Sequence, residues 1–150
     1  MLRPTKDRPL YSLVYATRSE RGLKVFRASQ VKAMVQQDIV RGAAKMTAST
    51  HASDQVEMFP SFSEVAPVPS TVLLGRELKS AETSLIACLH SAASPPIWSD
   101  VWPQILERHV VTHTQVNEVA NRLRLAGTVV FPDWAPRQRA PRDGDRLVLP

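Results

Sequence analysis

The sequence predicts an α+β fold: a strand-helix remnant of an α/β sheet, followed by a C-terminal winged helix-turn-helix of three helices and a two-stranded wing. Three observations carry this prediction. Amphipathic segments recur three times between residues 77 and 127, two β-branched segments then flank a basic, proline-rich loop, and one apolar strand-like segment lies near the N-terminus. The expected domains are the remnant (1–45), a linker (46–71) and the winged helix-turn-helix domain (72–150).

The remnant is expected to combine one strand with one helix. Leu10–Thr17, LYSLVYAT, is dense in strand formers and almost continuously apolar, which is typical of a strand buried on both faces of an α/β sheet. A polar turn over 18–22 precedes LKVFRASQVKAMVQQ, whose apolar residues recur at helical spacing. The stretch that follows is rich in Ala, Ser, Thr and Pro without clear periodicity, so we interpret it as a linker.

Three helices are expected in the C-terminal half. Glu77–Ser91 and Trp98–His109 each show apolar residues on one side of a helix. In the third helix Thr112 and Gln115 have the spacing of a capping box, in which each side chain binds the other residue's backbone N–H. An apolar stripe follows, and Gly127 stands where a left-handed residue commonly ends a helix.

A two-stranded wing is expected after the third helix. Thr128–Phe131 is β-branched and aromatic, and Pro132 ends it because proline cannot extend a ladder. Arg146–Leu149 supplies the second strand, after the turn-forming residues Asp143–Asp145. The loop between the two strands is basic and carries Arg137, Arg139 and Arg142.

Composition and charge fit a small domain with basic ends. The net charge is +5 over 150 residues, and Lys plus Arg outnumber acids by ten to three in residues 1–50 and by six to four in 112–150, but are outnumbered three to seven in 51–111. A basic balance permits attraction to phosphates. No apolar run reaches membrane-spanning length, the N-terminus is too polar for a secretory signal, and Cys88 is the only cysteine. We therefore expect a cytoplasmic protein with no membrane association.

The sequence contains no clear pattern of metal-ligating or catalytic residues. His109 and His113 are four residues apart, but residues 110–112 between them are expected to form a turn, which separates the two imidazoles. No phosphate-binding loop and no nucleophile-and-base arrangement is recognisable. We therefore predict no catalytic residue, no metal and no cofactor.

The two halves together resemble a known family. YSLVYATRSERGLKVFRASQVKAM resembles the last strand and following helix of the methyltransferase-like domain in the three-Cys-motif partner protein family, through Ala16–Arg18, Gly22–Leu23, Phe26 and Lys32. The part from about Val72 onward is similar to the winged-helix domain that closes those chains. The resemblance covers about two thirds of the chain. It implies partnership with a radical-type protein that carries three cysteines.

The chain also departs from that family in two respects. Val31 stands where the family often has a tryptophan, and none of the five glycines lies in a strand-to-helix glycine-rich loop. A nucleotide-containing cofactor such as S-adenosylmethionine needs that loop for close backbone approach, together with an acidic residue after the next strand. The chain therefore looks like the C-terminal part of a longer family member, and methyl-transfer activity is not carried over.

Binding is the remaining class of function, and nucleic acid, DNA in particular, is the expected partner. The polar side of the third helix offers side chains of the types that pair with base edges in the major groove, although Glu118 there would repel phosphate. The wing arginines would contact phosphates. The predicted contact residues are Thr114, Gln115, Asn121, Arg122, Arg137, Arg139 and Arg142.

The alternative is a protein–protein adaptor for a radical-type or methyltransferase partner. Trp98 and Trp102, four residues apart on the second helix, could form an exposed aromatic pair of the kind that is enriched in interface hot spots. Both tryptophans could equally pack into the three-helix core, which the sequence favours over exposure. Salt dependence separates the two functions, because phosphate binding weakens as ionic strength rises and an apolar interface does not.

Overall fold

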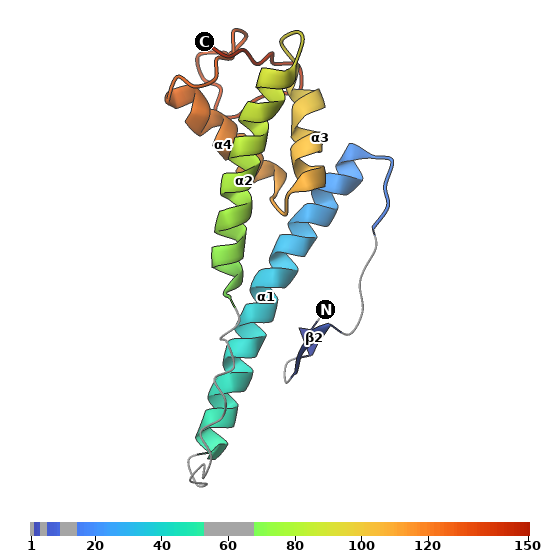
Figure 1. Cartoon of the computed structure of the whole chain (residues 1–150), viewed down its shortest axis with the longest axis vertical. Helices are drawn as coiled ribbons and strands as arrows, with labels where there is room; N and C mark the ends of the chain where they lie inside the picture. Colours follow the sequence, from blue (N-terminus) through green and yellow to red (C-terminus); the bar gives the residue numbers. More distant parts are fainter. Residues whose placement is uncertain (1, 4–5, 10–14, 53–67) are drawn as a thin grey trace.

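The structure, a computed structural model, describes residues 2–3, 6–9, 15–52 and 68–150. Within these ranges it contains one short antiparallel hairpin and four helices (Figure 1): β1 (Leu2–Arg3), β2 (Lys6–Pro9), α1 (Glu20–Ala52), α2 (Ser70–Ser91), α3 (Trp98–Arg108) and α4 (His113–Leu125). Helix accounts for 62% of the described residues and strand is confined to β1 and β2, so the fold is helical and the predicted α+β class is wrong.

The predicted sheet remnant is the first correction. Leu10–Val14 of the expected strand lies outside the described residues, and Tyr15–Thr17 is irregular chain that leads into α1. α1 then continues into the range expected to be linker, while residues 53–67 lie outside the described residues. Strand propensity is realised only against neighbouring strands. Tyr15 instead stacks its ring on Phe26 of α1, with 4.1 Å between the ring centroids.

The predicted wing is the second correction. Thr128–Phe131 and Arg146–Leu149 do not form strands; they meet only at an isolated bridge between Val130 and Val148. The two backbone hydrogen bonds of that bridge measure 2.8 and 2.9 Å between nitrogen and oxygen. The second segment is also bridged at Arg146, to Ile97 before α3. Neither segment forms a continuous strand, so the three-helix-plus-wing plan does not describe this chain.

The N-terminus of α3 explains why the wing does not extend. Ile97 precedes α3 and offers no side-chain cap. The backbone N–H of Trp98 therefore donates to the Asp145 carbonyl at 2.8 Å, and that of Ser99 donates to the Asp143 carbonyl at 3.0 Å. Unpaired N–H groups at a helix start need acceptors. The turn before the expected second strand is thus bound to the start of α3, and within that strand the Leu147 N–H donates to the Pro96 carbonyl at 3.0 Å.

The three C-terminal helices themselves agree with the sequence. α3 and α4 begin and end within a few residues of the expected positions, and α2 begins at Ser70 rather than Glu77. The capping box of α4 is present: the Gln115 N–H donates to the Thr112 hydroxyl at 3.2 Å, and the Thr112 N–H donates to the Gln115 side chain at 2.8 Å. Gly127 has a φ of 72° and ends the helix in the left-handed region, as predicted.

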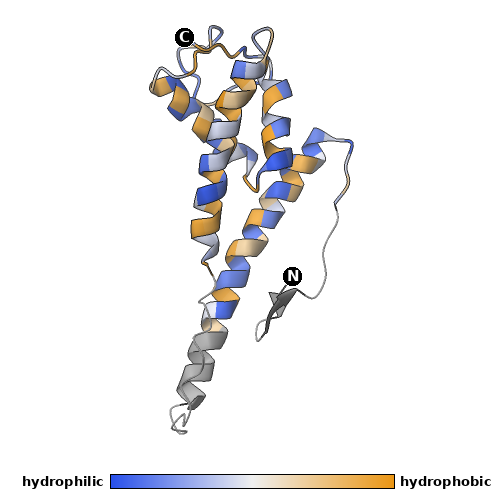
Figure 2. Ribbon diagram, in the orientation of Figure 1, coloured by the Kyte–Doolittle hydropathy of each residue, from blue (hydrophilic) through white to orange (hydrophobic). Residues whose placement is uncertain are grey.

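The apolar core lies among α2, α3, α4 and the segment after α4. Figure 2 shows apolar and polar residues alternating along the ribbons of all four helices, as in amphipathic helices. The largest fully buried side chains are Trp98, Trp102, Leu85, Ile105, Leu106, Leu147, Val101, Val111, Val116 and Val129. None of the described α1 side chains (residues 20–43) is buried; Leu23 only packs against the edge of this core.

The N-terminal part of α1 lies beside α3, the middle of α1 approaches the start of α2, and α1 then extends beyond the other helices (Figure 1). Farther along, the Asp38 carboxylate accepts a hydrogen bond from the Ser70 N–H at the start of α2 at 2.5 Å. None of the helices in the described ranges is long and apolar enough to cross a membrane.

Candidate nucleic-acid interface

The segment after α4 presents most of the predicted phosphate contacts, and internal hydrogen bonds fix its shape. We call residues 132–146 the arginine loop. The buried Asp145 carboxylate accepts hydrogen bonds from the Arg142 N–H at 2.8 Å and from the Gln138 side chain. The Gln138 carbonyl accepts from the Trp134 indole N–H at 3.1 Å, and the Ala135 N–H donates to the Gln138 side chain at 3.1 Å. These hydrogen bonds connect Trp134, Ala135, Gln138, Arg142 and Asp145, so they hold the loop in one conformation.

The arginines of this loop point to solvent. Arg137, Arg139 and Arg142 are all exposed, and so is Arg146. Across the described residues, no hydrogen bond or ion pair engages these four guanidinium groups. Two nearby carboxylates have other partners: Asp145 accepts from the Arg142 N–H, and Asp143 accepts from the Trp102 indole N–H at 3.3 Å. The loop therefore offers several free cations on a fixed backbone, an arrangement suited to phosphate oxygens.

The predicted base-reading residues of α4 are mostly engaged within the chain. Gln115 closes the capping box. Asn121 accepts two hydrogen bonds from the Arg124 guanidinium, both at 3.2 Å. Arg122 forms an ion pair with Glu82 of α2 at 2.6 Å. Of the four predicted α4 contact residues, only Thr114 is exposed and has no side-chain partner among the described residues, so α4 has little free capacity to pair with base edges.

Arg124 links α4 to the arginine loop, a connection that the sequence did not indicate. Its guanidinium carbon lies 4.4 Å from the centroid of the Trp134 ring while its N–H groups hold Asn121. A cation over an aromatic face is stabilising, so Trp134 helps to fix the loop against α4. Trp134, Gln138 and Asp145 support the loop through contacts that no spacing in the sequence reveals.

The two tryptophans proposed for a protein interface lie in the core instead. Trp98 is 0% and Trp102 1% exposed, so they form no exposed aromatic pair, and the core position that the sequence favoured is the one observed. Their indole N–H groups are satisfied, by the Asn117 side chain at 3.2 Å and by Asp143 at 3.3 Å. Buried indoles require such partners, and the exposed residue Asp143 supplies one for Trp102.

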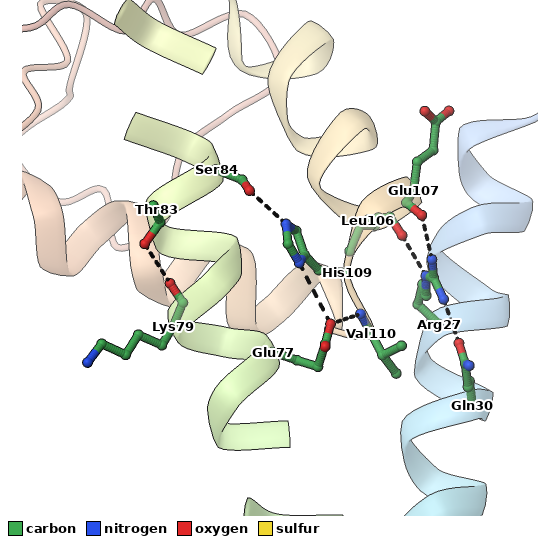
Figure 3. Close-up of polar contacts among 10 residues, drawn as sticks. All are labelled: Arg27, Gln30, Glu77, Lys79, Thr83, Ser84, Leu106, Glu107, His109 and Val110. Atoms are coloured by element: carbon green, nitrogen blue, oxygen red, sulfur yellow. Dashed lines mark hydrogen bonds and ion pairs between the residues drawn. The ribbon is translucent and has the colours of Figure 1, made fainter. Parts of the chain in front are cut away.

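A second polar cluster joins α2 to the turn between α3 and α4 (Figure 3). The His109 Nε2 lies 2.8 Å from the Ser84 hydroxyl, and its Nδ1 lies 3.7 Å from the Glu77 carboxylate. The same carboxylate oxygen accepts the Val110 N–H at 3.0 Å. The order Ser, His, Glu resembles that of a hydrolase, but Ser84 sits inside a helix whose N–H groups are bonded to carbonyls and form no oxyanion site. We infer that the role of this cluster is structural: it fixes the turn between α3 and α4 against α2.

Arg27 fastens α1 to the C-terminal end of α3 (Figure 3). Its Nε donates to the Leu106 carbonyl at 2.5 Å, one terminal nitrogen donates to the Glu107 carbonyl at 2.8 Å, and the other donates to the Gln30 side chain at 2.7 Å. The last carbonyls of a helix lack helical partners and attract cations. Burial lowers the pKa of Arg27, and the negative charge of Glu77 partly opposes that shift.

The two histidines considered for a metal have separate surroundings. His109 is the C-cap residue of α3, and His113 is the first residue of α4 with its ring against Trp102. Within the described ranges, no group of three or more His, Cys, Asp or Glu residues is placed to hold a metal ion. Comparison of the chain with known protein families, curated proteins and solved structures finds no match.

Proposed function

We propose that this chain is a non-catalytic nucleic-acid-binding module that contacts phosphates through Arg137, Arg139 and Arg142. The supporting observation is the arginine loop itself, in which exposed, unengaged guanidinium groups stand on a backbone fixed by Asp145 and Gln138. Contacts to phosphates position a protein on nucleic acid and carry no sequence information. A fixed loop also loses little conformational freedom when it binds.

The proposed binding is weakly selective for sequence. Reading base edges requires free paired donors and acceptors, and Gln115, Asn121 and Arg122 are held by Thr112, Arg124 and Glu82. To contact a base, Arg122 would first have to break its charge-assisted contact with Glu82. We therefore expect similar affinities for duplexes of different sequence and a strong dependence on salt.

The test is a fluorescence-anisotropy titration of labelled duplex DNA at about 0.05 M and about 0.15 M salt. A triple Arg137→Ala, Arg139→Ala, Arg142→Ala variant is expected to weaken binding and to lower the slope of affinity against salt by about three phosphate contacts. The matched control removes three exposed cations elsewhere, at Arg76, Lys79 and Arg108, and should change binding much less. Absence of binding at low salt, or equal losses in both triple variants, rejects the assignment to this loop.

A protein adaptor is the second candidate, and an exposed apolar surface favours it. Val35 and Ile39 of α1 and Val72 and Leu73 of α2 are all exposed, and the Asp38–Ser70 hydrogen bond brings these two stretches of chain close together. Exposed apolar patches are characteristic of contact surfaces. In this proposal the chain belongs to the three-Cys-motif partner protein family and binds a radical-type or methyltransferase partner through these helices. Such binding would persist as salt rises, unlike binding to phosphates. Either function is proposed to operate in the cytoplasm, where Cys88 stays reduced.

A further inference from the structure

Trp102 is the point at which three parts of the molecule meet. The Lys24 ammonium nitrogen of α1 lies 4.0 Å from the centroid of the Trp102 ring. The His113 ring of α4 packs edge-on against the same tryptophan, with 4.9 Å between the centroids. The indole N–H donates to Asp143 of the arginine loop at 3.3 Å. This arrangement fits a neutral His113, because the Lys24 ammonium then lies over the face of Trp102 while an uncharged ring packs against its edge.

A proton on His113 does not fit this arrangement. The Nε2 atom of His113 is buried and has no hydrogen-bond partner, so a proton there has no acceptor. Burial lowers the pKa of His113 below its usual 6.5, the Lys24 ammonium lowers it further, and Asp143 opposes the shift. Protonation would place two cations at one tryptophan, and only Asp143 compensates for them.

The other charged groups near α4 are already committed. From α2, Glu77 contacts His109 and the Val110 N–H, and Glu82 pairs with Arg122. From α3, the contact with His113 is the uncharged ring of Trp102. Lys24 from α1 and Asp143 from the arginine loop are thus the charges that act on His113. Of these two, Lys24 is on the element that is most easily displaced.

The N-terminal part of α1 is attached mainly by polar contacts. None of the described α1 side chains (20–43) is buried, and the attachments of this part to the other helices include Arg27 on α3, Lys24 on Trp102 and the partly buried Leu23. An element with little buried apolar surface opens at a small free-energy cost. Repulsion between Lys24 and a protonated His113 is therefore sufficient to lower the population of docked α1.

We propose that α1 is an acid-releasable arm: protonation of His113 expels Lys24 from Trp102 and undocks the N-terminal part of α1 from α3 and α4. The released state relieves the repulsion of His113 by Lys24, so it binds the proton more tightly than the docked state does. The docked state is favoured above pH 6.5 and loses its advantage as the pH falls below that value. Release uncovers the Lys24 side of Trp102. The inference does not depend on nucleic-acid binding.

The test is hydrogen–deuterium exchange of the full chain, read by mass spectrometry at about pH 7.5 and about pH 5.5, a range in which histidine titrates. After correction for the intrinsic pH dependence of exchange, α1 peptides over 21–35 are expected to lose protection by up to about tenfold per pH unit below 6.5. Peptides from α2 and α4 should keep their protection, which separates release of α1 from global acid unfolding.

Three variants make the outcome specific to His113. His113→Gln is expected to remove the pH dependence of α1 protection, and Lys24→Met, which keeps an apolar stem over Trp102 without the charge, should weaken that dependence. His90→Gln removes an exposed histidine of α2 and should behave like the wild type. If His113→Gln unfolds, Lys24→Met still carries the test. Protection of α1 that is independent of pH in the wild type, or that falls equally in Lys24→Met, overturns the proposal.

Discussion

α1 and the α2–α4 unit are both helical but are stabilised in different ways. The α2–α4 unit buries Leu85, Trp98 and Trp102 almost completely, whereas α1 keeps Val25 67% and Ile39 59% exposed and attaches through polar contacts such as Arg27 on the α3 carbonyls. Burial of apolar area contributes about 25 cal/mol per Å², and a polar contact adds only about 1 kcal/mol net. The comparison indicates one stable unit that carries a marginally attached arm.

The strongest test of this comparison is a cavity in the core. Leu85→Ala is expected to lower the free energy of unfolding by about 2–5 kcal/mol, because Leu85 is fully buried and its methyl groups leave a void. Urea denaturation followed by circular dichroism measures the change. Leu73→Ala, on the exposed side of the same helix, should stay within about 0.5 kcal/mol. Similar losses in the two variants would contradict the assigned core.

A smaller effect is expected where α1 attaches. Arg27→Met keeps the apolar stem but removes the hydrogen bonds to Leu106 and Glu107, which should weaken docking by about 1–2 kcal/mol. Limited proteolysis should then cleave α1 faster while the core resists. Lys32→Met is the matched control, since Lys32 is exposed on the same helix. An unchanged cleavage rate for Arg27→Met would show that other contacts hold α1.

The cap of α4 should contribute about 1 kcal/mol. Thr112→Ala removes the hydroxyl that accepts the Gln115 N–H and is expected to reduce stability by about that amount. The neighbouring Thr114→Ala, which removes an exposed hydroxyl, should have little effect. Thermal unfolding of both variants measures the difference, and an equal melting temperature for the two would argue against the capping box.

The smallest effect is expected on the outer side of α1. Ile39→Ser replaces a largely exposed side chain and should change stability by less than about 0.5 kcal/mol. A loss above 1 kcal/mol in the purified chain, measured by chemical denaturation at several concentrations, would mean that this side of α1 is buried in solution. Dependence of that loss on concentration would point to contact between copies.

Sequence reasoning succeeded where the signals are local. Thr112, Gln115 and Gly127 identify both ends of α4 because a cap and a left-handed residue act within a few positions. The predicted wing was wrong because Val130 and Val148 form only an isolated bridge, while Arg146 pairs with Ile97 before α3, and these long-range contacts are not encoded in any local pattern. The strand expected at Leu10–Thr17 failed in its described part, Tyr15–Thr17, where Tyr15 packs on a helix.

In the candidate interface, too, local features follow from the sequence and long-range contacts do not. The exposure of Arg137, Arg139 and Arg142 agrees with the basic, proline-rich composition around them. The partners of α4 do not follow from sequence, because Arg122 is paired by Glu82 of another helix. The burial of Trp102 likewise depends on α1 and on the arginine loop, which the spacing of Trp98 and Trp102 along α3 does not reveal.

The use of Asp143 and Asp145 carbonyls by the first turn of α3 has a consequence for biosynthesis. Residues 98 and 99 leave the ribosome well before residues 143–145, so the start of α3 has no acceptors for its N–H groups while the following segment is still being translated. Leu147 is the last of the buried core residues to be synthesised. The α2–α4 unit therefore reaches its final packing only after nearly all of this sequence has been synthesised, and a ribosome stalled before Asp143 would hold an α3 that frays at its N-terminal end.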